Sequence, residues 1–248
     1  MRLLPTFITT ILLAGTLRAQ DAPPSSHIEV KDPSLNAWYL TSSGEWIFSM
    51  PVLDVNGSDK GSIVRFAPFF NLRAMANYDI TPHFGFFTGL TVRNLGFIYD
   101  VPGSPDRFKF RTYNVGIPVG LKVGRMNRGL LFAGYELELP FNYKEKHFVN
   151  DDRVDRFNSW LSDRNERLFH SVMLGLQGVH GTTITVKYYL SNFHNTGFTE
   201  VKDGVEVKPY AGLNAHILYV SLAVDLFDGR EFIFHRSGER KKKRERKA

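Results

Sequence analysis

The residues best suited to catalysis gather in one polar stretch of the chain. His147, Asp151, Asp152 and Asp155 lie close together there, and a histidine base beside carboxylates could activate a water molecule or hold a cation. Arginines are interleaved with these acids, namely Arg153, Arg156, Arg164 and Arg167. Such mixed charge is common in solvated loops without chemistry. We therefore interpret the stretch as an outer loop and keep water activation as an alternative.

Two further pairs of residues combine a base with a nucleophile, and neither has a useful spacing. His170 is adjacent to Ser171, and His216 stands an odd number of positions before Ser221. Side chains at such spacings point to opposite faces of a β-strand, so neither pair can form a dyad. The chain has no cysteine and shows no metal-ligand spacing, phosphate-binding glycine loop or nucleophile elbow. The sequence predicts a protein that is not an enzyme and has no catalytic, cofactor-binding or metal-binding residues.

The clearest pattern in the chain is an alternation of residue types between positions 113 and 123. Every second position is apolar: Tyr113, Val115, Ile117, Val119, Leu121 and Val123. The positions between them are small or polar: Asn114, Gly116, Pro118, Gly120 and Lys122. A period of two predicts a β-strand with one apolar and one polar face. A strand that has lipid on one side and a crowded, watery lumen on the other has this composition.

Seven similar runs give eight predicted strands in all. They cover residues 45–53, 61–77, 84–99, 113–123, 129–141, 168–179, 182–193 and 210–227, and residues 38–40 could extend the first. Their polar faces carry charges: Arg65, Arg73, Arg93, Lys122, Glu136, Glu138, Lys187 and Asp225. A dry soluble core could not hold so many charges, whereas an ionic network inside a narrow barrel could.

The connections between these strands alternate in length. Short ones cover residues 78–82, 125–128 and 180–181, and longer ones cover 54–60, 100–107, 143–167 and 194–209. This alternation predicts an all-β fold, an eight-stranded antiparallel up-and-down transmembrane β-barrel with short periplasmic turns and longer outer loops. A barrel of this size is filled by its own side chains, which disfavours a diffusion pore.

The N-terminus resembles an export signal. Arg2 precedes an apolar stretch from Leu3 to Gly15 that is too short to span a bilayer, and residues 17–19 offer a cleavage site. A retained anchor helix is the alternative. We predict a signal peptide at 1–19, a periplasmic segment at 20–43, the barrel at 44–227 and a basic periplasmic tail at 228–248. The expected location is the bacterial outer membrane, with both termini in the periplasm.

The charge of the chain is concentrated in this tail. Residues 229–248 contain nine Lys and Arg against three Glu, a net +6 that equals the formal charge of the whole chain. Nucleic acid is not present in the periplasm, so we expect no nucleic-acid partner. Lys241, Lys242, Lys243 and Arg244 are predicted to contact anionic lipid headgroups or an acidic partner, and a merely solvated tail is the alternative.

The long stretch from 143 to 167 is the best candidate for binding. Its apolar residues recur at spacings close to three and four, namely Phe148, Val154, Phe157, Trp160 and Leu161. This spacing predicts a short amphipathic helix over the barrel mouth or at the lipid interface, with an irregular loop as the alternative. Phe157, Trp160 and Leu161 are the predicted contacts to a partner or to lipid.

One segment also carries a family resemblance. The stretch 111–122, read as RTYNVGIPVGLK, resembles the signature strand of the outer-membrane β-barrel family that includes PorT-like proteins, and a looser likeness covers 45–227. The resemblance implies an exported small barrel without cofactors, and most members have no assigned function. It favours a non-enzymatic structural or accessory subunit of an outer-membrane secretion or assembly complex. An enzyme acting on lipid A or surface peptides through the outer-loop acids, and a small-solute channel, are the alternatives.

Overall fold

The computed structural model describes residues 35–230, except 56, 57, 61, 62, 127, 179, 180 and 203. The predicted signal peptide at 1–19 and the tail residues Lys241, Lys242, Lys243 and Arg244 lie outside the described residues. Among the residues that are described, no helix has the length and apolar character needed to cross a bilayer.

The strands are β1 (Trp38–Val55), β2 (Ser58–Lys60), β3 (Arg65–Ala67), β4 (Leu72–Thr81), β5 (Phe84–Asp100), β6 (Asp106–Arg125), β7 (Gly129–Val149), β8 (Asp152–Trp160), β9 (Phe169–Gln177), β10 (Thr183–Tyr189), β11 (Glu200–Lys202), β12 (Val205–Val207) and β13 (Leu213–Asp228).

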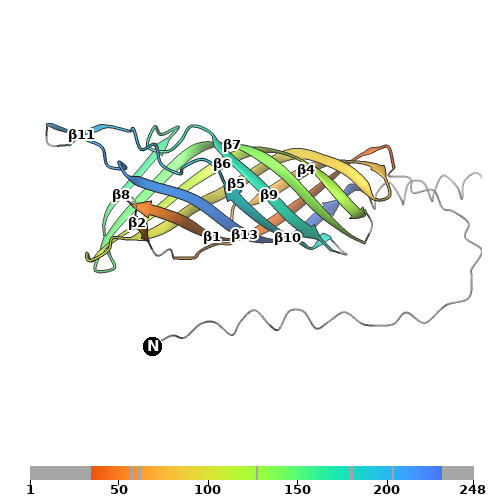
Figure 1. Ribbon diagram of the computed structural model, residues 1–248, viewed down its shortest axis with the longest axis horizontal. Helices are drawn as coiled ribbons and strands as arrows, with labels where there is room; N and C mark the ends of the chain where they lie inside the picture. The colour runs from red at the N-terminus through yellow and green to blue at the C-terminus, as the bar shows by residue number, and fades with distance from the viewer. Residues whose placement is uncertain are drawn as a thin grey trace, which may run out of the picture. The chain divides into compact units, whose positions relative to one another are not determined.

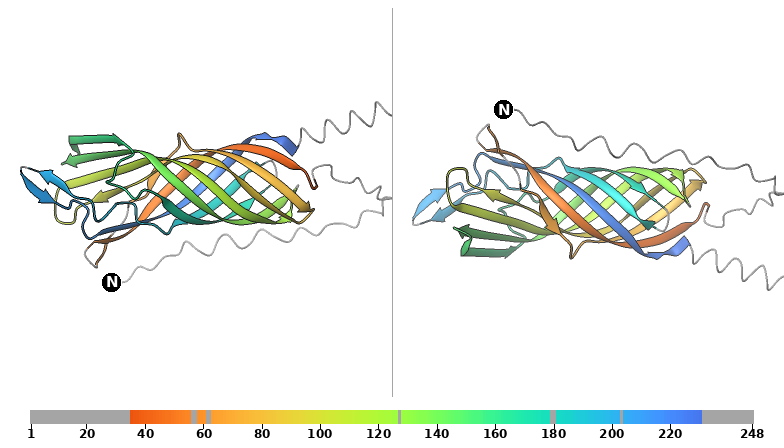
Figure 2. Two further views of the ribbon diagram at one scale, coloured as in Figure 1. Left: turned by 90° about the horizontal axis from the view of Figure 1, so that it is seen from above. Right: turned by 90° about the horizontal axis from the view of Figure 1, so that it is seen from below.

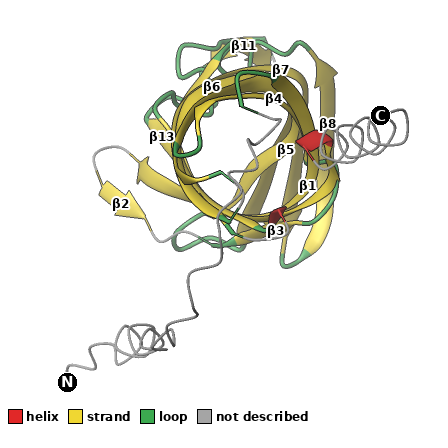
Figure 3. Cartoon of the chain, turned by 90° about the vertical axis from the view of Figure 1, so that its right-hand side faces the viewer, coloured by secondary structure: helices red, strands yellow, loops and turns green. Residues whose placement is uncertain are grey.

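Eight of these strands form a closed ring (Figures 1 and 3). Their order is β1, β4, β5, β6, β7, β9, β10 and β13, and each neighbouring pair is antiparallel. The ring is closed by β13 on β1, whose register runs from Thr41 opposite Asp228 to Val55 opposite Leu213. This arrangement confirms the predicted eight-stranded antiparallel up-and-down barrel.

The alternation along β6 places its apolar side chains on the outside of the ring. Ile117 and its apolar neighbours at every second position are exposed, whereas Asn114 and Lys122 are buried inside. The apolar run from Tyr113 to Val123 covers about 33 Å along the strand, or roughly 25 Å along the barrel axis at a tilt of about 40°. That height matches the hydrocarbon-facing band of outer-membrane barrels, so the exterior of this barrel is built for lipid.

Two rows of aromatic rings border the apolar band. Trp38, Tyr78 and Phe86 pack together with ring centroids 5.1–5.4 Å apart near the short turns, and we call them the turn-end belt. At the other end a second row has centroid separations of 5.8–6.4 Å, and this loop-end belt consists of Phe70, Tyr113, Phe141 and Trp160. Aromatic rings at both edges of an apolar band mark the two membrane interfaces.

The connections follow the predicted alternation. The short connections from β4 to β5, from β6 to β7 and from β9 to β10 join strand ends that all lie at one end of the barrel, and the strand ends joined by the longer connections lie at the other end (Figure 1). The second predicted strand differs, because residues 68–71 interrupt it between β3 and β4. Phe70 adopts φ 63° in this interruption. The amide of Asn71 donates to the carbonyl oxygens of Ala67 (2.7 Å) and Glu45 (3.3 Å), which holds the kinked backbone in place.

The helix predicted within 143–167 is wrong, because the structure forms a β-hairpin there. The upper part of β7 pairs with β8, from Asn142 opposite Trp160 to Val149 opposite Asp152. Asn150 and Asp151 have φ of 52° and 66°, the positive values that a tight hairpin turn requires. Phe157 and Trp160 are three residues apart, which would share a helix face but points them to opposite faces of a strand.

A charged side chain on the outer face of β6 tests whether that face contacts lipid. Ile117→Arg places a guanidinium near the middle of the apolar band and should lower the free energy of unfolding by about 2–4 kcal/mol. Urea titration of the barrel in phospholipid vesicles measures the change, with the heat-sensitive mobility of the folded barrel in detergent gels as a check of folding. Val154→Arg, on the exposed β8, is the matched control. Equal stability of the two variants would contradict a lipid-facing Ile117.

Candidate functional site: a filled lumen beneath an open mouth

The centre of the lumen contains six charged side chains that pair across the barrel. This central network consists of three carboxylates and three cations, namely Glu45, Glu136, Glu138, Arg73, Arg93 and Lys187. Arg93 binds Glu136 at 3.0 Å and also binds Glu45, and Lys187 binds Glu136 at 2.7 Å and also binds Glu138. The six formal charges cancel, which is the condition under which ions tolerate burial.

Neutral side chains complete the central network. The hydroxyl of Tyr189 donates to Glu138 at 2.7 Å, and Arg93 donates to the hydroxyl of Tyr219 at 2.5 Å. Thr91 donates to Glu136. Gly116 lies opposite these groups, and a Cβ atom there would collide with the carboxylate of Glu136. The small residues on the inner face of β6 therefore make room for the charges that cross the lumen.

A second polar group closes the lumen at the short turns. In this turn-end cluster, Asp79 forms an ion pair with Lys122 (2.6 Å between Nζ and Oδ1) and accepts a hydrogen bond from the hydroxyl of Tyr39 (2.8 Å). Lys122 also donates to Tyr39 at 2.9 Å and to Asn77 at 3.1 Å. Arg230, in a helical turn just after β13, adds a guanidinium 3.6 Å from Asp79.

A small polar cavity of about 30 Å³ borders the turn-end cluster, which is room for one water molecule. Its lining includes side chains from strands around the ring, among them Thr41, Asn77, Gln177, Thr183 and Asp225. The narrowness of this space shows that side chains fill the turn-end part of the lumen.

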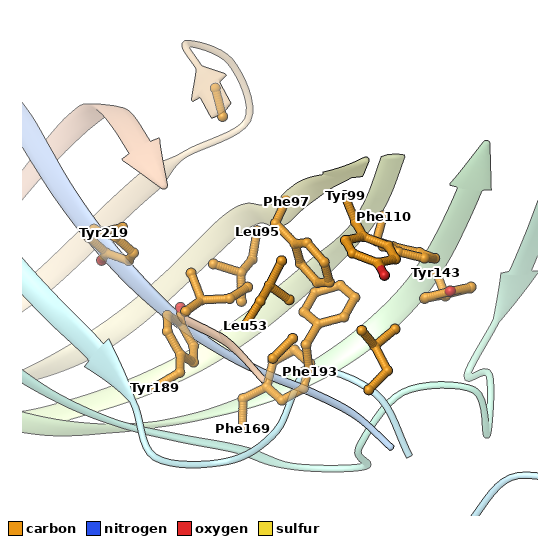
Figure 4. Packing of buried hydrophobic residues seen from close by; sticks show 14 of the residues in the cluster. Leu53, Leu95, Phe97, Tyr99, Phe110, Tyr143, Phe169, Tyr189, Phe193 and Tyr219 are labelled. Atoms are coloured by element: carbon orange, nitrogen blue, oxygen red, sulfur yellow. The ribbon is translucent and has the colours of Figure 1, made fainter. Parts of the chain in front are cut away.

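The loop end of the lumen is filled by aromatic rings. The segment after β10 enters the barrel, where Phe193 packs on Phe97 and Phe169 with centroids 5.2 and 5.7 Å apart. His194 stacks on Tyr210 at 4.3 Å and meets Phe110 edge-on at 4.4 Å. Figure 4 shows the rings of Phe97, Phe110, Phe169 and Phe193 pointing into the barrel interior. We call Phe97, Phe110, Phe169, Phe193, His194 and Tyr210 the aromatic plug.

His194 is the one histidine of this plug and is fully buried. Burial lowers the pKa of His194 from 6.5 to about 3, because the surrounding rings offer little solvation to an imidazolium. Its Nε2 lies 3.4 Å from the hydroxyl of Tyr143, and its Nδ1 has no hydrogen-bond partner among the described residues. The plug therefore contains a neutral imidazole at physiological pH.

Above the plug lies an open pocket of about 530 Å³, which we call the mouth pocket. Arg164 is its central charge: the guanidinium lies over the ring of Phe157 at 4.1 Å and pairs with Glu145 at 3.5 Å and with Glu200. Tyr210 donates to Glu145 at 2.6 Å. The pocket is lined by β5–β8, β11 and the segment before β13, with Tyr99, Phe108, Phe110, His147, Asp155, Lys202 and Leu213 among its residues.

The structure brings together only part of the predicted acid cluster. His147 and Asp155 are opposite each other on β7 and β8, and both line the mouth pocket. Asp151 instead pairs with Arg107 at 2.6 Å, outside the pocket, and Asp152 is exposed at the hairpin turn. In the part of the chain that the structure describes, no group of three or more His, Asp and Glu is placed to hold a metal ion.

Asp106 is the partner of His147 that the sequence did not indicate. Its Oδ1 lies 2.6 Å from Nε2 of His147, and Ser104 donates to its other oxygen. Hydrogen bonds from Ser104 and His147 lower the pKa of Asp106. These residues are distant in the chain and meet only because β6 pairs with β7, with Phe108 opposite His147. A local motif search cannot reveal such a pair.

The three predicted contact residues occupy two different places. Phe157 is half-buried under Arg164 in the mouth pocket. Trp160 and Leu161 are 69% and 68% exposed, and Trp160 stacks on Phe141 in the loop-end belt. An exposed tryptophan at this level suits a membrane interface. The contacts of Phe157, Trp160 and Leu161 with lipid or a partner stay a prediction.

Strand order, apolar exterior, aromatic belts and charged lumen together define a small transmembrane β-barrel of the outer-membrane kind. Neither a family model nor a curated protein matches the chain. Solved structures resemble it at low identity: Ail, the attachment invasion locus protein of Yersinia pestis, has 9% identity over 76% of this chain and 98% of its own, with a TM-score of 0.34. Neisserial surface protein A has 13% identity over 75% and 96%, with a TM-score of 0.34. CarO of Acinetobacter baumannii has 9% identity over 75% and 96%, with a TM-score of 0.35.

Similarities at this level carry no argument about function. The barrel class rests instead on the strand pairing and the lipid-facing exterior of this chain. The resemblance of residues 111–122 to PorT-like proteins stays a prediction.

Removing one cation tests the central network. Lys187→Met leaves Glu136 and Glu138 without one of their partners and should cost about 3–5 kcal/mol of unfolding free energy, measured by urea titration in vesicles. Lys187→Met with Glu138→Gln restores charge balance and should recover part of that loss. Lys202→Met, an exposed position on β11, is the matched control. If Lys187→Met had the same unfolding free energy as the wild type, the ion pairs of Lys187 would not stabilise the barrel.

Acid should loosen the aromatic plug through His194. Below pH 6.5 the unfolded chain binds a proton at His194, and the folded barrel binds one only near pH 3, so stability falls as the pH is lowered. The slope in this window is about 1.4 kcal/mol per pH unit. His194→Phe should flatten it in urea titrations at several pH values. His83→Phe, exposed at a short turn, should leave it unchanged, and a slope that His194→Phe also leaves unchanged would refute the assignment.

Proposed function

We propose that this protein is a non-enzymatic integral barrel of the bacterial outer membrane that serves as a structural or accessory subunit of an outer-membrane complex, with a secretion or assembly complex as the expected setting. The observation that carries the proposal is the filled lumen. Bonded or packed side chains cross the barrel at three levels, the turn-end cluster, the central network and the aromatic plug. Contacts with other molecules therefore fall to the exterior and the loop end.

A solute channel fits this interior poorly. Opening the central network would separate Arg93 and Lys187 from carboxylates that they contact inside a narrow space. Breaking buried ion pairs is costly, since each ion left alone keeps its desolvation penalty. An eight-stranded barrel is in any case just wide enough for its own side chains.

Two hairpins offer a surface for a partner protein. The β7–β8 and β11–β12 hairpins project beyond the ring of strands (Figure 2). Within the described residues β8 pairs only with β7, so its other edge has unpaired backbone groups that a strand of a partner could join. Val154 on β8 and Val201 and Val205 on the second hairpin are largely exposed, which adds apolar contacts for such a partner.

The positions of the described chain ends support an orientation for the proposed barrel. Leu35 bridges to Asp79, and Asp228 lies opposite Thr41, so both ends lie at the short turns. Short turns face the periplasm in bacterial outer-membrane barrels. The proposal therefore places both termini in the periplasm, where the basic residues Lys241 to Arg244 would meet lipid headgroups or an acidic partner.

One observation favours a second candidate, an enzyme acting on lipid A or surface peptides. His147, paired with Asp106, shares the mouth pocket with Asp155, and a histidine between carboxylates can act as a base toward water. Asp151 and Asp152 lie elsewhere, so the site lacks the cluster that the sequence suggested. This candidate stands behind the first.

A photo-crosslinking residue at Val154 tests the leading proposal in intact cells. We expect specific adducts with one or a few outer-membrane proteins, identified by mass spectrometry, because the exposed β8 would lie in the interface. The same residue at His83, exposed at a short turn, is the control for nonspecific capture. A monomeric barrel with no adduct from Val154 would contradict the proposal. Altered lipid A or surface peptides in a His147→Ala strain would favour the enzyme instead.

A further inference from the structure

The outer face of β6, β7 and β8 beyond the loop-end belt contains six cations. We call them the basic face: Lys109 and Arg111 on β6, Lys144 and Lys146 on β7, and Arg153 and Arg156 on β8. The strand register places like charges directly opposite each other. Arg111 lies opposite Lys144, Lys109 opposite Lys146, and Lys146 opposite Arg156. Like charges in such cross-strand positions destabilise a sheet, so this arrangement needs an explanation.

These six cations differ from Arg107 and Arg164, two other bases at the loop end. Arg107 pairs with Asp100 and Asp151, and Arg164 pairs with Glu145 and Glu200. None of the six forms an ion pair with any residue that the structure describes. Arg107 and Arg164 are therefore neutralised by acids, whereas the basic face presents uncompensated positive charge.

The cations of the basic face also repel one another, which disfavours the protonated form of two of the lysines. Partial burial, and then Arg111 and Arg156, lower the pKa of Lys144, and partial burial with Arg111, Arg153, Arg156 and Lys109 lowers the pKa of Lys146. Both lysines lie beyond the apolar band. A bound anion would relieve this repulsion.

The basic face is continuous with the lipid-facing wall. The guanidinium of Arg111 and the ammonium of Lys144 each lie 5.2 Å from the ring centre of Tyr113, a member of the loop-end belt. Arg111 is two residues beyond Tyr113 on the same face of β6, about 7 Å further along the strand. Lys109 follows and lies over Phe148 at 4.6 Å. The cations therefore begin where the hydrocarbon-facing band ends, at the depth of lipid headgroups.

We propose that the basic face binds the phosphate groups of anionic lipid headgroups in the leaflet that surrounds the loop end. Arginine can bind a phosphate through two parallel N–H donors, and lysine adds a mobile point charge. The strand register brings two cations together at each of two positions, Arg111 with Lys144 and Lys109 with Lys146, and we infer that one phosphate binds both members of a pair. A soluble polyanion could bind the same charges, but it would not contact the apolar band that adjoins them. A lipid contacts both, with its headgroup at the cations and its acyl chains at the apolar band, so we favour lipid.

Native mass spectrometry of the folded barrel in zwitterionic detergent tests the proposal. The probes are lipid A with both phosphates and the same lipid with its phosphates removed. The wild type should retain the phosphorylated lipid more strongly. Replacing Arg111, Lys144 and Lys146 by Gln should weaken its retention by at least about tenfold, since each cation near an anionic surface contributes about fivefold. The control replaces the exposed bases Arg128, Lys202 and Lys208 by Gln, which removes the same charge elsewhere.

A second measurement separates binding from folding. Without anionic lipid, the Arg111, Lys144 and Lys146 triple variant should unfold at a urea concentration equal to or higher than the wild type, because repulsion is relieved. Equal retention of both lipids, equal losses in the two triple variants, or binding of heparin without lipid A would each overturn the proposal. These outcomes are independent of whether Val154 crosslinks to a partner protein.

Discussion

The structure depends on one constraint: the backbone of every membrane-spanning strand must find its hydrogen-bond partners within the protein. Hydrocarbon offers no alternative donors or acceptors, so an open sheet edge cannot remain inside a bilayer. The long register between β1 and β13, from Thr41 to Val55, removes the two edges that the sheet would otherwise expose. The strand tilt and the narrow lumen are consequences of closing a ring with only eight strands.

Closure also reverses the usual distribution of polarity. The exterior uses Val, Leu, Ile and Phe, so the polar half of each alternating strand must be accommodated inside. The interior is too narrow for bulk water, and the charges therefore neutralise one another directly. Glu136 meets Arg93 and Lys187, which come from different sides of the ring, and Asp79 meets Lys122 in the same way. The interior is thus a set of ion pairs in two polar layers, with aromatic rings filling the loop end.

Much of this architecture could be predicted from the sequence, because the signal is periodic and local. The alternation around Ile117 gives the strand, its outward face and the inward position of Lys122 without any tertiary information. The contacts between Arg93 and Glu136, or between His147 and Asp106, join residues about forty positions apart. They depend on register and shear, which periodicity does not specify. The hairpin at Asn150 was missed because spacings of three and four suggested a helix, while the asparagine and aspartate of a tight turn were the better signal.

The position of Arg230 has a consequence for how the barrel can come apart. Its guanidinium donates to the backbone carbonyl of Met126 and to the hydroxyl of Tyr39, so Arg230, two positions after the last strand, is bound to β1 and to the turn that follows β6. These contacts hold the β1–β13 junction together at the end of the barrel with the short turns. At the other end of this junction, Val55 lies opposite Leu213, and no comparable side-chain contact joins the two strands there among the residues described. Separation of β1 from β13, whether during membrane insertion or under mechanical load, should therefore begin at Val55 and Leu213 and proceed toward Arg230.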